Sequence, residues 1–238
     1  MFTLLSPRTL RICTLFVVFL QLSCKNEEIG GSKDVNPETV YFDYAAWGDE
    51  EGGDVTLKLQ YRFGGSEGTT LVLDEPSNVT LDGEPIPVDS SSLKGAYYEV
   101  TRPVADFAGE HTIVFTDIKG KKYSQTFRFP AFSLAADIPG VIGRDSLGIS
   151  LAGVDSTDYI KVLMTDTSSY SQGIDTVFRP KEGRIVLPRQ AIARLSPGPI
   201  HLVLYNDRDI QLSEAPKEGG RLSLSYNIKR ELELKEQP

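Results

Sequence analysis

The chain contains two histidines and a single tryptophan, which are the first residues to consider for a functional site. His111 falls in phase with apolar residues of one alternating segment, and His201 falls in phase with those of another. The two lie in separate halves of the chain, so a Ser/His/Asp arrangement would need those halves to pack closely. No nucleophile-elbow, zinc-protease or phosphate-loop motif occurs in the sequence. We therefore predict no catalytic residue.

Three acidic loops offer oxygen atoms that a hard cation prefers. None of them has the ligand spacing of an EF-hand, and we predict no cofactor, with calcium left open as the alternative. These loops are Asp49-Glu50-Glu51, Asp155-Ser156-Thr157-Asp158 and Asn206-Asp207-Arg208-Asp209.

Aromatic residues beside the first acidic loop suggest a binding surface. Trp47 lies just before that loop, and Tyr44 precedes it by three residues. An exposed aromatic ring presents a flat apolar face that suits a sugar ring. We predict Trp47 and Tyr44 as ligand-facing aromatics.

The N-terminal segment has the composition of an export signal. Arg8 and Arg11 precede Ile12–Leu22, a stretch without charges. That stretch is long enough for the apolar part of a signal peptide, but it is shorter than the ~20 apolar residues that span a bilayer.

The segment Leu22-Ser23-Cys24 resembles the lipobox of bacterial lipoproteins. Gln21 stands where the usual leucine would, and Leu20 lies one place further out. In that family the cysteine is acylated and becomes the new N-terminus, which implies that Cys24 carries the lipid. The following residues, Lys25-Asn26-Glu27-Glu28, resemble the export signal of surface lipoproteins in the Bacteroidota. The resemblance implies a lipid anchor in the outer membrane, with surface exposure favoured.

Cysteine usage and charge restrict the chemistry of the mature chain. Cys13 leaves with the signal and Cys24 is acylated, so no disulfide, thiol nucleophile or thiolate metal site remains. The chain has 25 basic and 33 acidic residues, and loss of Arg8 and Arg11 makes it more acidic still. Such a surface argues against nucleic acid as a partner.

Alternation of apolar and polar residues predicts strands along most of the body. It is clearest over Asp54–Phe63, where it predicts one buried and one solvated face. Asp82-Gly83 predicts a two-residue hairpin turn, Pro188–Leu195 predicts the one short helix, and Arg230 interrupts the apolar face of the last strand, marking its predicted exit from the sheet. Other strands are predicted from residue 39, over 69–73, 78–81, 95–101, 110–117, 121–129, 146–151, 158–165, 174–178, 184–187, 200–205 and 210–213, and from residue 222.

About seven short strands in the first half, with turn signals between them, are typical of an immunoglobulin-like sandwich. The predicted fold class is all-β: two tandem immunoglobulin-like antiparallel β-sandwich domains after a lipoprotein signal peptide and a flexible tether. The arrangement is similar to that of many small Bacteroidota lipoproteins, a resemblance that transfers no functional residue. The predicted divisions are 1–23 for the signal peptide, 24–37 for the acylated cysteine and tether, 38–130 for the first domain and 131–234 for the second.

These observations favour a non-catalytic lipoprotein of the outer membrane that acts as a binding or scaffolding module. Its partners are the membrane, through the lipid on Cys24, and an envelope protein or a glycan. Two alternatives stay open: a glycan-binding lipoprotein of a polysaccharide-uptake system, and a hydrolase with an active site between the domains. Exposed aromatics favour glycan capture, whereas a cleft joining His111 or His201 to carboxylates favours a hydrolase.

Overall fold

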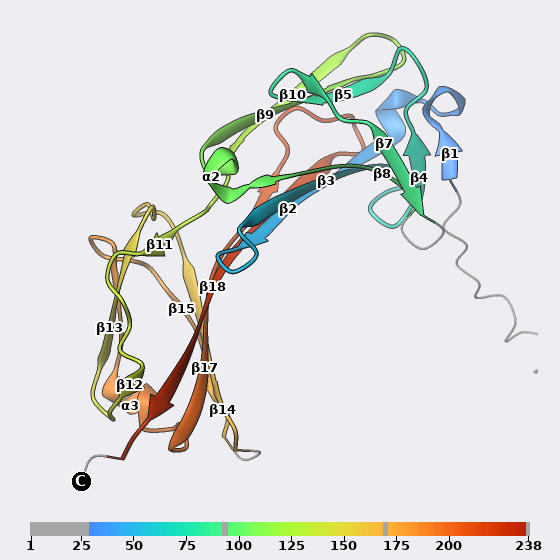
Figure 1. Ribbon diagram of the computed structural model, residues 1–238. Helices are drawn as coiled ribbons and strands as arrows, with labels where there is room; N and C mark the ends of the chain where they lie inside the picture. Colours follow the sequence, from blue (N-terminus) through green and yellow to red (C-terminus); the bar gives the residue numbers. More distant parts are fainter. Residues whose placement is uncertain (1–28, 92–94, 169–170, 237–238) are drawn as a thin grey trace, which may run out of the picture.

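The computed structural model describes residues 29–91, 95–168 and 171–236. Strands are the main secondary structure of these residues, and they form two sandwiches joined at an angle (Figure 1). The prediction of an all-β fold is therefore confirmed. The predicted signal peptide and Cys24 lie outside the described residues.

One large sheet extends through both sandwiches. Its main path has the order β1-β4-β3-β2-β18-β17-β14-β15, with β7, β8 and β12 attached beside that path. The strands are β1 (Ile29–Gly31), β2 (Val40–Asp49), β3 (Asp54–Phe63), β4 (Thr69–Val72), β7 (Val88–Ser91), β8 (Gly95–Pro103), β12 (Val141–Ile142), β14 (Ile160–Asp166), β15 (Ile174–Phe178), β17 (Gly198–Gln211) and β18 (Gly220–Leu234).

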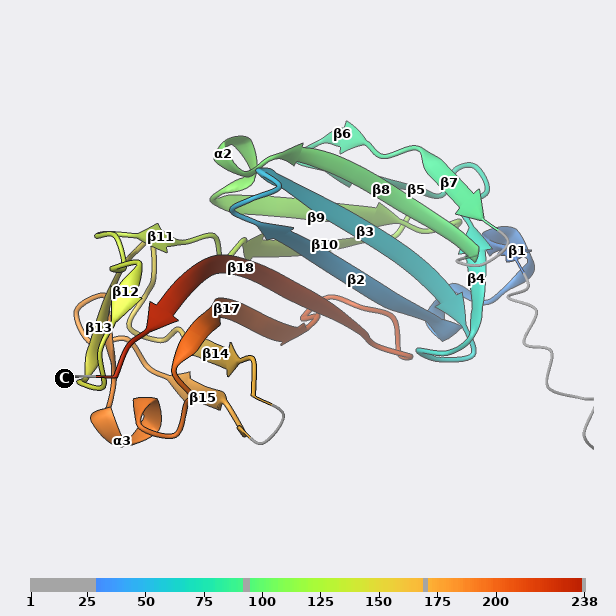
Figure 2. The same ribbon diagram turned by 60° about the horizontal axis from the view of Figure 1, so that its bottom comes forward.

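Two smaller sheets cover the core-facing side of the large one, one in each sandwich (Figures 1 and 2). Short helical turns lie in several of the connections between strands. The first small sheet contains β5 (Asn78–Leu81), β6 (Glu84–Pro85), β9 (Glu110–Thr116) and β10 (Lys122–Arg128), and the second contains β11 (Ser133–Leu134), β13 (Leu147–Ala152) and β16 (Arg184–Leu187). The helical turns are η2 (Ser32–Asp34), η3 (Pro37–Thr39), α2 (Val104–Phe107) and α3 (Arg189–Ile192).

The sequence pattern located several elements closely. The strands over 54–63, 78–81, 174–178 and 184–187 have the predicted bounds. Asp82 and Gly83 both have positive φ, 54° and 87°, and they connect β5 to β6 as the predicted hairpin turn. The helix predicted over Pro188–Leu195 is confirmed only as the single turn α3.

The last two strands differ from the prediction. The strands predicted over 200–205 and 210–213 form one strand, β17, which pairs with β18 from Gly198↔Leu234 to Gln211↔Arg221. The predicted exit of the last strand at Arg230 is wrong, because β18 continues to Leu234. Arg230 instead lies at the bend, where it donates hydrogen bonds to both carboxylate oxygens of Glu50.

The hairpin of β17 and β18 joins the two halves of the molecule. β18 pairs in parallel with β2 over Gly220–Asn227, and its far end pairs with β12. Residues from the predicted second domain thus complete the sheet of the first. The division at residue 130 stays a proposal, and the structure adds that the large sheet crosses it.

The connection between the halves is packed into the core. Tyr226 is 3% exposed, and its ring makes edge contacts with Phe129 at 6.0 Å and with Phe132 at 5.7 Å between centroids. The fully buried Asn206 donates a hydrogen bond of 3.3 Å to the carbonyl of Pro130. Close packing of this kind restricts hinge motion between the halves.

The flexible tether predicted over 24–37 is wrong for its second half. Ile29–Gly31 pairs in parallel with β4 as strand β1. The buried Ser32 accepts a hydrogen bond of 2.8 Å from the amide of Asp74, and Lys33 forms an ion pair with the same aspartate. These contacts with β4 and the loop after it are long-range, so the polar composition of the segment did not reveal them.

Candidate functional site

Trp47 lies on the solvated face of the large sheet. Residues of β2 alternate strictly, with Phe42, Tyr44 and Ala46 buried, so the residues between them face outward. The Trp47 side chain belongs to this outward set and is 43% exposed. A large aromatic ring exposed on a regular strand is available to a ligand.

A hollow of about 340 Å³ lies beside Trp47. It forms because Ala45, which has only a methyl group, stands between Trp47 and Asp43 on the outward face of β2. The residues opposite Ala45 on the two neighbouring strands are Lys58 of β3 and Ser223 of β18. The hollow is lined by Asp43, Tyr44, Ala45, Trp47, Lys58, Gln60, Arg221 and Ser223.

The polar side chains of this hollow hold one another in place. Asp43 accepts a hydrogen bond of 2.9 Å from Arg221 and forms an ion pair of 3.4 Å with Arg62. The hydrogen bond and the charge of Asp43 raise the pKa of Arg221 above its ordinary value. Gln60 accepts from Arg62 at 2.8 Å and donates to the carbonyl of Ala96 at 3.3 Å. A ligand here meets donors and acceptors whose orientation is already set.

The prediction that Tyr44 faces a ligand is wrong. Tyr44 is 2% exposed, and its ring stacks on Phe42 at 5.6 Å while its hydroxyl group bonds to Tyr61 at 3.2 Å. Burial raises the pKa of Tyr44 well above its ordinary value. Its atoms form the floor of the hollow beneath the outward residues. The phase it shares with Phe42 is the sequence signal for this burial.

A second hollow, of about 450 Å³, lies at the bend. It opens where one edge of β18 runs from the end of β2 to the start of its pairing with β12. Two of its carboxylates have basic partners on β18: Glu50 binds Arg230, and Glu51 lies 3.9 Å from Lys229. The lining residues are Asp49, Glu50, Glu51, Asn227, Lys229, Arg230 and Glu231, and no hydroxyl or thiol nucleophile is among them.

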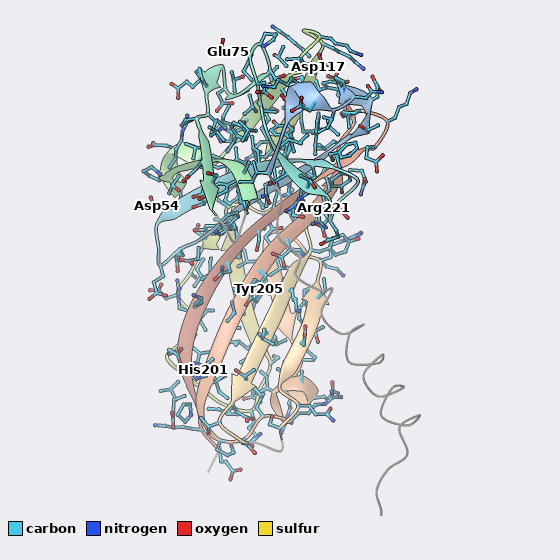
Figure 3. The ribbon with its side chains drawn as sticks, turned by 90° about the vertical axis from the view of Figure 1, so that its right-hand side faces the viewer. Asp54, Glu75, Asp117, His201, Tyr205 and Arg221 are labelled. Atoms are coloured by element: carbon cyan, nitrogen blue, oxygen red, sulfur yellow. The ribbon has the colours of Figure 1, made fainter. Side chains whose placement is uncertain are left out.

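The two histidines do not share a site. His111 of β9 is 7% exposed, with Nδ1 at 2.8 Å from Asp82 and Nε2 at 2.9 Å from the carbonyl of Phe107. His201 of β17 lies on the outward face of the large sheet (Figure 3), where it bonds to Glu231 at 2.7 Å. Glu231 lines the hollow at the bend, but both members of this pair are more than half exposed. Open pairs of this kind lack the enclosed, oriented geometry of a catalytic dyad.

Two of the predicted acidic loops contact each other through the basic side chain of Arg208, which pairs with Asp158. Asp158, which is 4% exposed, forms an ion pair with Arg208 and accepts the amide hydrogen of Asp155 at 2.8 Å. Asp207 and Asp209 accept hydrogen bonds of 2.6 Å from serines of β18. The described residues contain no group of three or more carboxylates, histidines or cysteines arranged to hold a metal ion. Calcium binding stays an untested alternative.

The predicted site residues thus fall into three sets. Trp47 lines a hollow, Tyr44 lies in the core, and Cys24 lies outside the described residues. Asp43, Arg221 and Ser223 were not predicted as neighbours of Trp47, because the pairing of β2 with β18 joins segments far apart in the chain. The face of Lys58 and Gln60 was predictable, because alternation placed both on the solvated side of their strand, but their proximity to Trp47 was not.

Comparisons with known proteins identify no family. No protein-family model matches this chain, and no curated protein matches it. Among the described residues, no helix has the length and apolar character that crossing a membrane requires.

Solved structures show only low likeness. The glycan-binding protein SGBP-B of the Bacteroides ovatus mixed-linkage glucan utilization locus, solved with a heptasaccharide, is 14% identical with a TM-score of 0.26. This match covers 77% of the present chain, which spans about half, 53%, of that protein. The two immunoglobulin domains of DIP-gamma are 9% identical over 83% of this chain and 95% of theirs, with a TM-score of 0.23. A tandem repeat of a large adhesion protein is 14% identical over 76% of this chain and 56% of that one, with a TM-score of 0.25. Likeness at this level transfers no function.

Proposed function

We propose that this protein is a non-catalytic, lipid-anchored module of the outer membrane that binds a glycan in the hollow beside Trp47. The observation that carries the proposal is the half-exposed indole ring at the edge of a hollow lined by fixed polar groups. A sugar ring has an apolar face of C–H groups and a rim of hydroxyl groups. The indole ring matches the face, while the carboxylate, amide and guanidinium groups match the rim.

Glycan capture is favoured over the two other functions. The centre of a protein-binding surface is apolar and poor in acidic residues and lysine, whereas this hollow contains Asp43 and Lys58. A hydrolase needs an acid–base pair aimed at a common cavity. His111 is buried against Asp82, and His201 forms an open surface pair. The membrane anchor is proposed from the resemblance of Leu22-Ser23-Cys24 to a lipobox.

The test of glycan binding is the retention of the soluble body, residues 26–238, in gels that contain single polysaccharides. We expect the wild type to be retained by at least one polysaccharide, and Trp47→Ala to lose that retention. Phe63→Ala is the matched control, because Phe63 is 45% exposed on β3 but does not line the hollow. Failure of every polysaccharide to retain the wild type, or equal retention of Trp47→Ala, would contradict the proposal.

Two further measurements address the other parts of the proposal. The retained polysaccharide should keep its chain length during prolonged incubation with the protein, and release of reducing ends would reveal a hydrolase. A fatty-acid probe fed to cells should label the full-length protein and should not label Cys24→Ala. Labelling of the variant would exclude Cys24 as the anchor.

A further inference from the structure

The outward face that carries Trp47 continues into the second sandwich. Trp47 of β2 lies opposite Ser225 of β18, and Ser225 lies opposite Asp207 of β17. Two residues further along β18, Asn227 lies opposite Tyr205 of β17. Opposed residues of paired strands point to the same side of a sheet, so Trp47 and Tyr205 share one face. Figure 3 looks onto this face, where Arg221, Tyr205 and His201 follow one another along the hairpin of β17 and β18.

The path between the two aromatic rings is free of large side chains. The residues along it, Ser225, Asn227 and Asp207, are short and polar. Ser225 donates to Asp207 at 2.6 Å, which holds both side chains close to the sheet. Trp47 and Tyr205 are two strands and two residues apart, which corresponds to roughly 12 Å between their Cα atoms. That distance exceeds one sugar ring and corresponds to a few consecutive rings.

The shape of the face favours an internal stretch of chain. The large sheet forms the inner side of the bend between the sandwiches, and the two small sheets lie on the outer side (Figure 1). Viewed from below, the sheet continues past both ends of the path, with β3 beyond β2 and β14 beyond β17 (Figure 2). A concave sheet face that extends past both contacts accepts the middle of a polymer, whereas a site for a single sugar encloses most of its ligand.

The charges on this face favour a neutral chain. Two of its basic side chains have acidic partners, because Arg221 binds Asp43 and Lys161 lies 3.3 Å from Asp175. A third, Lys58, lies over the ring of Tyr97 at 5.2 Å. Asp207 adds a negative charge to the path and accepts a hydrogen bond from Ser225. A surplus of negative charge along the path repels uronate or sulfate groups.

We propose that the ligand is a neutral, linear polysaccharide that crosses β18, with one unit on Trp47 and a later unit on Tyr205. This inference rests on the proposed glycan-binding function and extends it by naming the class of chain and a second contact. Because both contacts lie on a single sheet whose two halves are packed together at Tyr226, the two aromatic rings keep a fixed spacing. Affinity therefore depends on chain length until both rings are covered.

The experiment measures the affinity of the soluble body for oligosaccharides of increasing length, cut from a polysaccharide that retains the wild type. We expect affinity to rise with length and then level off once the chain reaches both rings. Tyr205→Ala should lower affinity for the long oligosaccharides by about tenfold, the usual value of one aromatic contact, and leave the shortest bound ones unaffected. Trp47→Ala should weaken all lengths.

Two control variants make the result specific. Tyr205→Phe keeps the ring and should bind like the wild type, which shows that a loss in Tyr205→Ala does not come from misfolding. His201→Ala removes an exposed side chain of the same strand, outside the path, and should leave binding unchanged. Affinity that is independent of length, or long chains bound equally by Tyr205→Ala, would overturn this inference while leaving glycan binding intact. A wild type that binds no glycan would overturn the proposed function itself. Tighter binding of a uronate-containing chain than of its neutral counterpart would overturn the neutral class.

Discussion

At the scale of single residues, an exposed carboxylate is paired with a buried histidine: Asp82 lies 2.8 Å from Nδ1 of His111, which is 7% exposed. Partial burial alone would raise the pKa of Asp82, but hydrogen bonds from His111 and from the amide of Thr112 outweigh it and lower that pKa below its ordinary value. The carboxylate also fixes the β5–β6 turn against β9, so its charge contributes to the stability of the first sandwich.

The sign of this contribution follows from the lowered pKa. The charged form of Asp82 stabilises the fold above the pKa of the unfolded chain, near 3.8, and the effect is lost as pH falls through the lower pKa of the folded state. Asp82→Asn should therefore be less stable than the wild type at pH 7 in denaturant unfolding, and the gap should narrow as pH falls below 4. Asp106→Asn, at an exposed position of α2, is the matched control and should show no such gap. A gap between Asp82→Asn and the wild type that is constant from pH 7 to pH 3 would contradict this account.

Of the two aromatic residues predicted from the sequence to face a ligand, Trp47 is exposed and Tyr44 is buried. Both are aromatic and both lie near the acidic loop, yet they have opposite phase along β2. Tyr44 shares its phase with Val40 and Phe42, so strict use of alternation would have placed it in the core. The partners of Trp47 on β18 were not predictable, because nothing local specifies which distant strand pairs with β2.

At the scale of elements, the hairpin of β17 and β18 connects the two sandwiches, because β18 pairs with β2 in one and with β12 in the other. Alternation at Leu222, Leu224, Tyr226 and Ile228 predicted a strand with one buried face, and all four residues are 3% exposed or less. Strand identity and facing were therefore predictable from local pattern. The parallel pairing of β18 with β2 was not predictable, because the two strands are far apart in the sequence. The pairing of β1 with β4 was not predictable either, because β1 lies in a polar segment.

This pairing leads to a prediction about a fragment. Residues 38–130, the proposed first domain, lack β18, so β2 would expose an unpaired edge over Phe42–Asp49 and uncover part of the core. We expect this fragment to lack a cooperative unfolding transition and to be cleaved rapidly by protease, whereas the soluble body, residues 26–238, resists cleavage. A fragment that is stably folded and resistant to protease would show that the boundary at residue 130 separates independent domains.

At the scale of the whole molecule, one sheet provides a continuous surface across two sandwiches. The ring of Tyr226 between Phe129 and Phe132 fills the junction, and the ion pair of Arg230 with Glu50 fixes the edge of the bend. The outward face of the sheet is therefore a rigid, concave surface with Trp47 on one side of β18 and Tyr205 on the other. A preorganised surface loses little conformational entropy when it binds an extended chain.

Trp47 makes the central claim directly measurable, because it is the single tryptophan of the sequence. All tryptophan emission from the soluble body comes from a side chain that is 43% exposed. Titration with a polysaccharide that retains the wild type should shift this emission to shorter wavelength and protect it from quenching by acrylamide, at the concentrations that calorimetry gives for binding. Calorimetric saturation with unchanged emission and unchanged quenching would place the ligand elsewhere and contradict the account.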